Sequence, residues 1–243
     1  MNGGQTIHAL FEAFNERPNS IDPVELLCRI YETTDPELSS RIAERTNSQT
    51  PVKTRDIHSI DIIQIKLEAE FKALHFFYER KRNQYASQRK NQRVDAERCG
   101  QVALAFYQKM PLEAKNRKNL IFGDKYEEIF SDATTAHSLL IPFQLFERIE
   151  AERVQRTRGQ NAWLRYASYH LLYVLRLIAD KKKIELEFGN LDRIWKCYKK
   201  GKSAIAAARK KSKMEHGDEF EDVLFLKSNS AKTMIANEII PTA

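Results

Sequence analysis

The segment AWLRYASYHLLYVLRLIA, residues 162–179, is the most apolar stretch of the chain. It is barely long enough to cross a bilayer, and its interior contains Arg165, His170 and Arg176. Charged side chains in the middle of a lipid-embedded helix are costly, so a membrane span is a poor interpretation. The segment instead predicts a buried helix in a soluble protein, with no membrane partner.

The composition supports a folded core and a reducing compartment. A chain of 243 residues with 42% apolar content can form one large domain or two small ones. The three cysteines, at positions 28, 99 and 197, are too scattered to predict a disulfide framework, which indicates a cytoplasmic protein. The formal net charge of +7 permits a nucleic-acid partner without requiring one.

Apolar spacing and capping residues predict mixed structure near the N-terminus. Apolar side chains at positions 7, 10, 11 and 14 share one face of a helix that begins near Gln5. A strand is expected at residues 24–31. Asp35 is expected to cap a short helix whose first residue is Pro36, and Ser59 is expected to cap another.

Helical patterns dominate the rest of the chain, after a short extended aromatic run that starts at His75. Pro142 is expected to kink or interrupt the helix that contains it. The C-terminal segment regains apolar residues and is expected to pack back onto the body. Four further helices are predicted, namely from Arg93 onward, over 134–156, over 162–179 and over 191–198.

These elements together predict an α+β fold that is mainly α. A small N-terminal α/β portion is expected at residues 1–84 and a helical C-terminal region at residues 85–243. The α/β portion is expected to be incomplete, because a glycine turn normally follows an element that needs turning and only Met1 precedes this one.

Two polar turns are candidates for a nucleotide or phosphate site. In the first, glycines lead into a helix N-terminus, where free amides attract anions, and the alternative is a plain tight turn. The second follows a predicted helix and has a helix C-cap as its alternative. We expect the two turns to meet in space. Their residues are Asn2, Gly3, Gly4, Gln5 and Thr6 in the first, and Asn47, Ser48 and Gln49 in the second.

A third candidate is the basic segment from Tyr78 to Arg93, which contains six positive side chains and one carboxylate, Glu79. Cations interleaved with tyrosine and amide side chains are typical of a surface that holds phosphates and stacks on bases. The alternative is a solvated surface without a partner. The candidate nucleic-acid-binding residues are Arg80, Lys81, Arg82, Arg89, Lys90 and Arg93.

Catalytic signatures are mostly absent from the sequence. There is no Walker A loop, no C-x-x-C pair, no H-E-x-x-H and no G-x-S-x-G. The six histidines are dispersed and have no ligand-like spacing to one another or to a cysteine. The sequence therefore predicts no cofactor and no protein-bound structural metal.

The motifs, in their order, resemble the abortive infection phage resistance family, abbreviated AIPR. The resemblance rests on NGGQTIHALFEAF, on ERTNSQTPVKTRD, on FYERKRNQY and on the closing EFEDVLFLKS run. Members of that family are usually longer, so this chain resembles their C-terminal portion. A weaker resemblance links it to ParB-like and D-G-Q-x-R proteins, with Asn2 in place of the Asp and Thr6 in place of the Arg.

The resemblance implies phage defence through binding of nucleic acid or a nucleotide. One alternative is a nuclease or nucleotide hydrolase whose other catalytic residues, and any divalent metal, belong to a missing N-terminal region. Another is a helical module that binds a partner protein, such as a restriction or modification component. We expect the isolated chain not to be catalytic, and its oligomeric state stays open.

Overall fold

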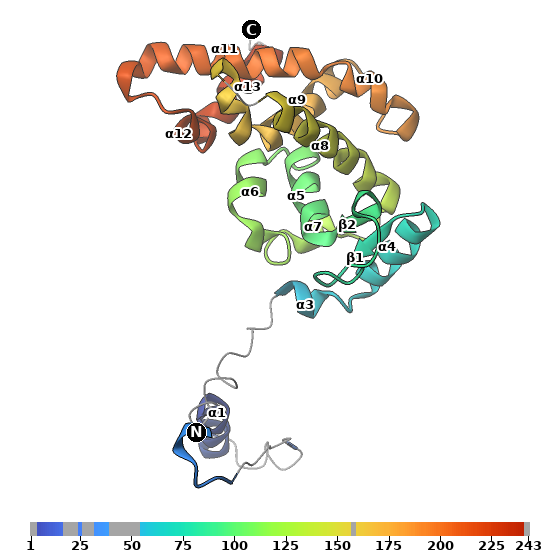
Figure 1. Ribbon diagram of the computed structural model, residues 1–243, viewed down its shortest axis with the longest axis vertical. Coiled ribbons are helices and arrows are strands. Elements are labelled where there is room, and N and C mark those ends of the chain that lie inside the picture. Colours follow the sequence, from blue (N-terminus) through green and yellow to red (C-terminus); the bar gives the residue numbers. More distant parts are fainter. Residues whose placement is uncertain (1–3, 17–23, 26–31, 39–53, 157–158, 241–243) are drawn as a thin grey trace. The chain divides into compact units, whose positions relative to one another are not determined.

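Helices make up most of the described part of the chain, in agreement with the predicted fold class (Figure 1). This computed structural model describes residues 4–16, 24–25, 32–38, 54–156 and 159–240. The chain divides into two compact units, Met1–Val52 and Lys53–Ala243. The sequence motifs predict a boundary between two regions at residue 84, and this position lies within the second unit.

In the described residues of the first unit, the structure confirms two predictions from the sequence. Helix α1 spans Gly4–Glu16, as the apolar spacing predicts. The carboxylate of Asp35 accepts hydrogen bonds from the backbone amides of Glu37 and Leu38, at 2.8 and 3.2 Å, so the predicted N-cap is confirmed. The predicted strand at 24–31 lies outside the described residues except for Val24 and Glu25, which have no regular structure.

The second unit opens with two helices and a small sheet. Helix α3 spans Thr54–His58, α4 spans Ile62–Ala73, β1 spans Phe77–Glu79 and β2 spans Arg93–Asp95. The strands pair in parallel, with Tyr78 opposite Val94. A parallel pair needs a connection of a dozen or more residues, which residues 80–92 supply here. The basic segment is therefore the crossover of the sheet, and it includes the 3₁₀ turn η2, Lys90–Gln92.

The prediction that Ser59 caps a helix is wrong. Its buried hydroxyl donates a hydrogen bond backward to the Asp56 carbonyl at 2.6 Å, so it closes α3 instead of opening α4. The next helix begins after Asp61. Leu67 and Phe71 of α4 are completely buried, as the apolar spacing predicts.

The helix predicted from Arg93 begins three residues later, because Arg93–Asp95 pair with β1. Asp95 then caps α5, Ala96–Phe106, by accepting the backbone amide of Arg98 at 2.9 Å. Short elements connect α5 to the long helix, namely α6 (Pro111–Asn116), η3 (Lys118–Leu120) and α7 (Tyr126–Ile129).

Helix α8 spans Ala136–Arg156 and continues through Pro142, so the proline does not interrupt the helix, and the alternative prediction of a kink stays a prediction. A proline lacks the amide that would bond to the carbonyl four residues earlier, here that of Ser138. The hydroxyl of Tyr107 donates to that carbonyl at 2.6 Å. A side chain from elsewhere in the fold thus supplies the missing hydrogen bond.

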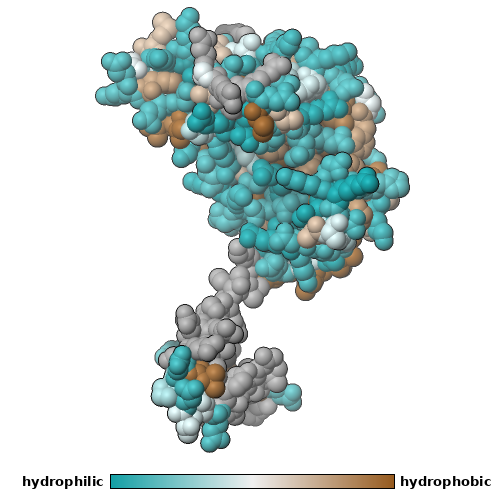
Figure 2. Space-filling model, in the orientation of Figure 1, coloured by the Kyte–Doolittle hydropathy of each residue, from teal (hydrophilic) through white to brown (hydrophobic). Residues whose placement is uncertain are grey.

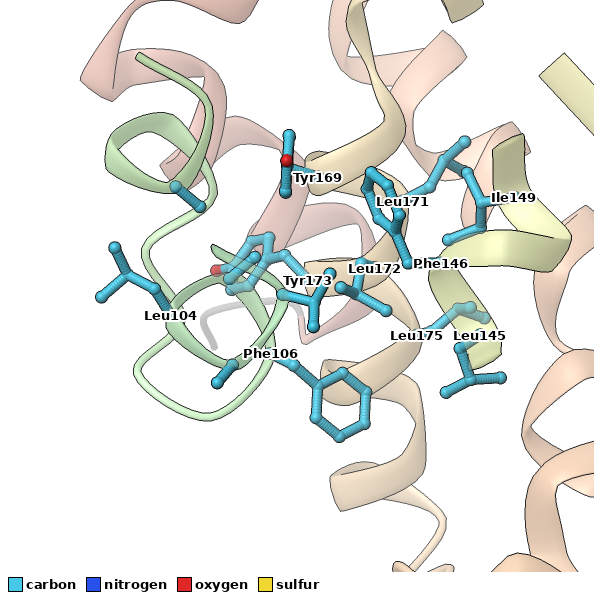
Figure 3. Close-up of a cluster of buried hydrophobic side chains, with 14 of the residues drawn as sticks. Leu104, Phe106, Leu145, Phe146, Ile149, Tyr169, Leu171, Leu172, Tyr173 and Leu175 are labelled. Atoms are coloured by element: carbon cyan, nitrogen blue, oxygen red, sulfur yellow. The ribbon is translucent and has the colours of Figure 1, made fainter. Parts of the chain in front are cut away.

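The apolar segment at 162–179 forms two elements instead of the single predicted helix. The 3₁₀ helix η4 spans Gly159–Tyr166, and α9 spans Ser168–Lys181. Leu172 and Leu175 of α9 are completely buried and lie beside side chains of α5 and α8 such as Phe106 and Leu145 (Figure 3). The prediction of a buried helix is therefore confirmed. None of the helices in the described residues is long and apolar enough to span a membrane.

The C-terminal segment packs back onto the rest of the second unit, as expected, and it forms six elements. They are η5 (Phe188–Asn190), α10 (Leu191–Trp195), α11 (Tyr198–His216), η6 (Gly217–Glu219), α12 (Asp222–Leu226) and α13 (Asn229–Ile239). A Cβ at Gly201 of α11 would lie 3.1 Å from Val174 of α9, so the glycine allows these helices to approach closely. Arg209 of α11 pairs with Asp222, the first residue of α12, at 2.6 Å.

Candidate functional site

A buried arginine, Arg55, anchors the basic crossover, and this residue is only 5% exposed. Its Nη2 atom lies 2.6 Å from the Asp95 carboxylate and donates to the Glu79 carbonyl at 2.7 Å. Its Nε atom donates to the Arg80 carbonyl at 3.0 Å. One guanidinium therefore holds the end of β1, the start of the crossover and the end of β2 together.

Two carboxylates fold the crossover back onto the sheet. Glu79, 4% exposed, accepts hydrogen bonds from Arg93 at 2.9 and 3.0 Å and from the backbone amide of Tyr85 at 3.1 Å. Glu68 of α4 accepts from Arg80 at 2.7 Å and from the Tyr85 hydroxyl at 2.6 Å. Arg80 also donates to the Ser59 carbonyl. A nearly buried carboxylate is stable only when it is paired in this way.

This network divides the six predicted cations into two groups. Arg80 and Arg93 point inward to carboxylates and are 19% and 23% exposed. The side chains of Lys81, Arg89 and Lys90 are exposed and make no hydrogen bond or ion pair within the described part of the chain. Arg82 is intermediate between the groups, at 55% exposed and 3.7 Å from Glu97. The segment is thus a hydrogen-bonded frame that presents exposed cations.

The tyrosines of the segment are less available than the sequence indicates. Tyr78 is completely buried, and its hydroxyl donates to Gln64 at 2.9 Å. Burial raises the pKa of the Tyr78 hydroxyl well above its usual value. Tyr85 is partly buried, with its hydroxyl on Glu68. Neither tyrosine ring is therefore free to stack on a base.

Other aromatic side chains border the crossover instead. A cavity of about 320 Å³ lies against its C-terminal half, and its walls combine one lysine, three rings and two amides. They belong to Lys72, His75, Phe76, Phe77, Gln88 and Gln92. The backbone of His75 is left-handed, with φ at 62°, which turns the chain sharply between α4 and β1. The HFF triplet at residues 75–77 was the available sequence signal for these rings.

The two polar turns predicted as a nucleotide site fall largely outside the described residues. This applies to Asn2, Gly3, Asn47, Ser48 and Gln49. The backbone of residues 4–6 forms the first turn of α1, and the side chains there are outside the described set as well. The expected meeting of the two turns therefore stays a prediction. Among the described residues, no group of three or more His, Cys, Asp or Glu could hold a metal ion.

Comparison with protein families gives a match to the AIPR protein family over residues 1–222. This chain belongs to the AIPR family. The match includes the basic crossover, the buried Arg55 and the described elements from α1 to η6, and it ends at Asp222, the first residue of α12. The AIPR chain is accordingly an abortive-infection phage-resistance-type protein. Comparison with curated proteins gives no match, and comparison with solved structures gives none either.

Proposed function

We propose that this AIPR protein acts in phage defence by binding nucleic acid, in single-stranded form, at the basic crossover. The observation that carries the proposal is the separation of cations described above. Lys81, Arg89 and Lys90 are exposed and form no hydrogen bond or ion pair with the other described residues, on a frame that Arg55 and Glu79 hold in place. Phosphate contacts of this kind supply affinity without sequence information.

The neighbouring cavity supports a single strand as the ligand. Phe76 and Phe77 provide ring faces, and Gln88 and Gln92 provide amide donors and acceptors, within one cavity of about 320 Å³. Unpaired bases stack on aromatic side chains and expose their hydrogen-bonding edges, whereas bases in a duplex do not. The face of the second unit seen in Figure 2 is largely hydrophilic, which is compatible with a polyanionic ligand.

The test is fluorescence anisotropy with labelled single-stranded and double-stranded oligonucleotides over a salt series. The test variant combines Lys81→Gln, Arg89→Gln and Lys90→Gln, and the matched control combines Lys199→Gln, Lys200→Gln and Lys210→Gln on α11. We expect tighter single-strand binding, and a slope of log affinity against log salt that the test variant flattens by about two units. The control should leave that slope unchanged.

Two outcomes would reject the proposal. One is the absence of binding by the unmodified chain at low salt, and the other is an equal change of slope in the test and control variants. Binding of an acidic protein instead would favour the interaction-module alternative. Cleavage of the oligonucleotide in the presence of magnesium or manganese would favour the nuclease alternative.

A further inference from the structure

A second concentration of positive charge lies where α5, α6, α8, η4 and α9 meet, around a cavity of about 200 Å³. None of its residues belongs to the basic crossover. We call it the inner cationic pocket, and define it by four cations and two phenols. They are Arg98, Lys115, Arg153, Arg165, Tyr166 and Tyr169.

The charges of the inner cationic pocket are unbalanced. Glu150 is the single carboxylate among the lining residues, and it forms a two-pronged pair with Arg153 at 2.7 and 3.1 Å. The other three cations form no ion pair with a carboxylate in the described part of the chain, although Glu150 also attracts Lys115 and Glu147 attracts Arg98 at longer range. Arg98 and Lys115 are partly buried and Arg165 is exposed, and partial removal of a charge from water is costly unless the charge finds a partner.

Neutral groups hold these remaining cations in place. Lys115 donates to the Tyr166 carbonyl at 2.7 Å, and Arg98 donates to the Tyr169 hydroxyl at 2.8 Å. Arg98 also lies 5.3 Å from the centre of the Phe146 ring, and Arg165 lies 5.8 Å from that of Tyr166. An ammonium has three N–H groups and a guanidinium has five, so each cation keeps donors for a further acceptor.

Two pKa shifts in the inner cationic pocket are consistent with its excess of positive charge and of hydrogen-bond donors. Burial lowers the pKa of the Lys115 ammonium, the positive charges of Lys227 and Arg153 lower it further, and the Glu150 carboxylate offsets part of this shift. Burial raises the pKa of Tyr169 to about 12, so its hydroxyl stays protonated and can donate while it accepts from Arg98. An anion in the pocket would meet donors on several sides and offset the repulsion among the cations.

We infer that the inner cationic pocket binds a phosphate monoester. Arginine can donate two parallel hydrogen bonds to phosphate oxygens. A phosphate monoester is a dianion, so it balances the excess of three cations among the lining residues better than a ligand with a single carboxylate does. A volume of about 200 Å³ is below the usual 300–1,000 Å³ of pockets for drug-sized ligands, so it fits a phosphate with the adjoining part of a sugar. The source is either a free nucleoside monophosphate or the terminal phosphate of an oligonucleotide.

Calorimetric titration of the intact chain distinguishes the phosphate from the rest of the ligand. AMP should bind and adenosine should not. The variant with Arg153→Gln and Arg165→Gln alters two partly or fully exposed side chains, so the fold should be retained, and Lys115→Met adds a second test inside the pocket. Loss of charge-assisted hydrogen bonds should weaken AMP binding by about tenfold or more, whereas Lys199→Gln with Lys210→Gln should not change it.

Oligonucleotides with a 5′-phosphate or a 5′-hydroxyl separate the two sources. A preference for the 5′-phosphate that the pocket variant removes indicates a strand end, and AMP binding without such a preference indicates a free nucleotide. Equal affinity for AMP and adenosine, no binding of any phosphorylated probe, or an unchanged AMP affinity in the folded pocket variant would overturn the inference. Salt-slope measurements on the crossover variant report on the proposed function separately, because the two sets of residues do not overlap.

Discussion

The Nη2 atom of Arg55 lies 2.6 Å from the Oδ2 atom of Asp95, across a sequence distance of forty residues. The same carboxylate caps α5 through the amide of Arg98. The pair therefore links α3, the small sheet and the first helix of the body. It also places the basic crossover, because Arg55 binds the carbonyls of Glu79 and Arg80.

Arg55→Met should destabilise the second unit by about 3 kcal/mol, because it removes two hydrogen bonds to backbone carbonyls, one of them buried, and leaves Asp95 without its cation. Urea denaturation measures the change. Arg117→Met, at an exposed arginine, serves as the control and should change the stability by less than about 0.5 kcal/mol. A similar small effect of both substitutions would show that Arg55 does not hold the sheet together.

Although Arg80 and Lys81 are neighbours, Arg80→Gln should mainly lower stability, whereas Lys81→Gln should mainly change oligonucleotide binding. Arg80 is bonded to Glu68 and to the Ser59 carbonyl, so its loss should cost about 1 to 3 kcal/mol of stability. Lys81 is exposed, so its loss should leave stability nearly unchanged but flatten the salt slope of oligonucleotide binding by about 0.7 to 0.9. Denaturation and anisotropy on both variants check this, and equal salt slopes would argue against the division of the cations.

Tyr107→Phe should destabilise the protein by about 1 kcal/mol, because the Ser138 carbonyl loses its hydrogen-bond donor. In a Pro142→Ala background the new amide can donate to that carbonyl, so the same substitution should cost much less. A double-mutant cycle by thermal or urea denaturation measures the coupling. If the two substitutions are additive, Tyr107 does not compensate for the proline.

Stability should fall as the pH drops from about 6.5 toward 4, in part because of His170. Burial lowers the pKa of this completely buried imidazole from 6.5 to about 4. The unfolded chain therefore takes up a proton over this range while the folded chain does not, which favours unfolding. The full effect is about 3 kcal/mol and is absent above pH 7.

His170→Leu is the matched comparison for that pH dependence. Neither ring nitrogen of His170 has a hydrogen-bond partner among the described residues, so the substitution should keep or raise stability at neutral pH. Melting temperatures at pH 7, 6 and 5 should decrease less steeply in the variant. Parallel decreases in the two proteins would assign the acid sensitivity to other groups.

Features that depend on neighbours in the sequence were predictable from it. The Asp35 cap, the buried positions of Leu67 and Phe71, the extended run that becomes β1 and the buried helix α9 all follow from patterns within a few residues. Helix periodicity, capping and β-propensity act over that range. The sequence also marked the basic segment and showed the motifs of the AIPR family.

Only the tertiary structure decided how these pieces are used. The apolar segment breaks between η4 and α9 at Ala167, where Lys115, fifty-one residues away, takes the Tyr166 carbonyl that a continuous helix would use. Likewise, Glu68 and Glu79 decide which arginines of the crossover are bound and leave Lys81 free. The inner cationic pocket assembles side chains from five elements. Such partners are chosen by contacts between distant segments, and the local pattern around each residue contains no information about them.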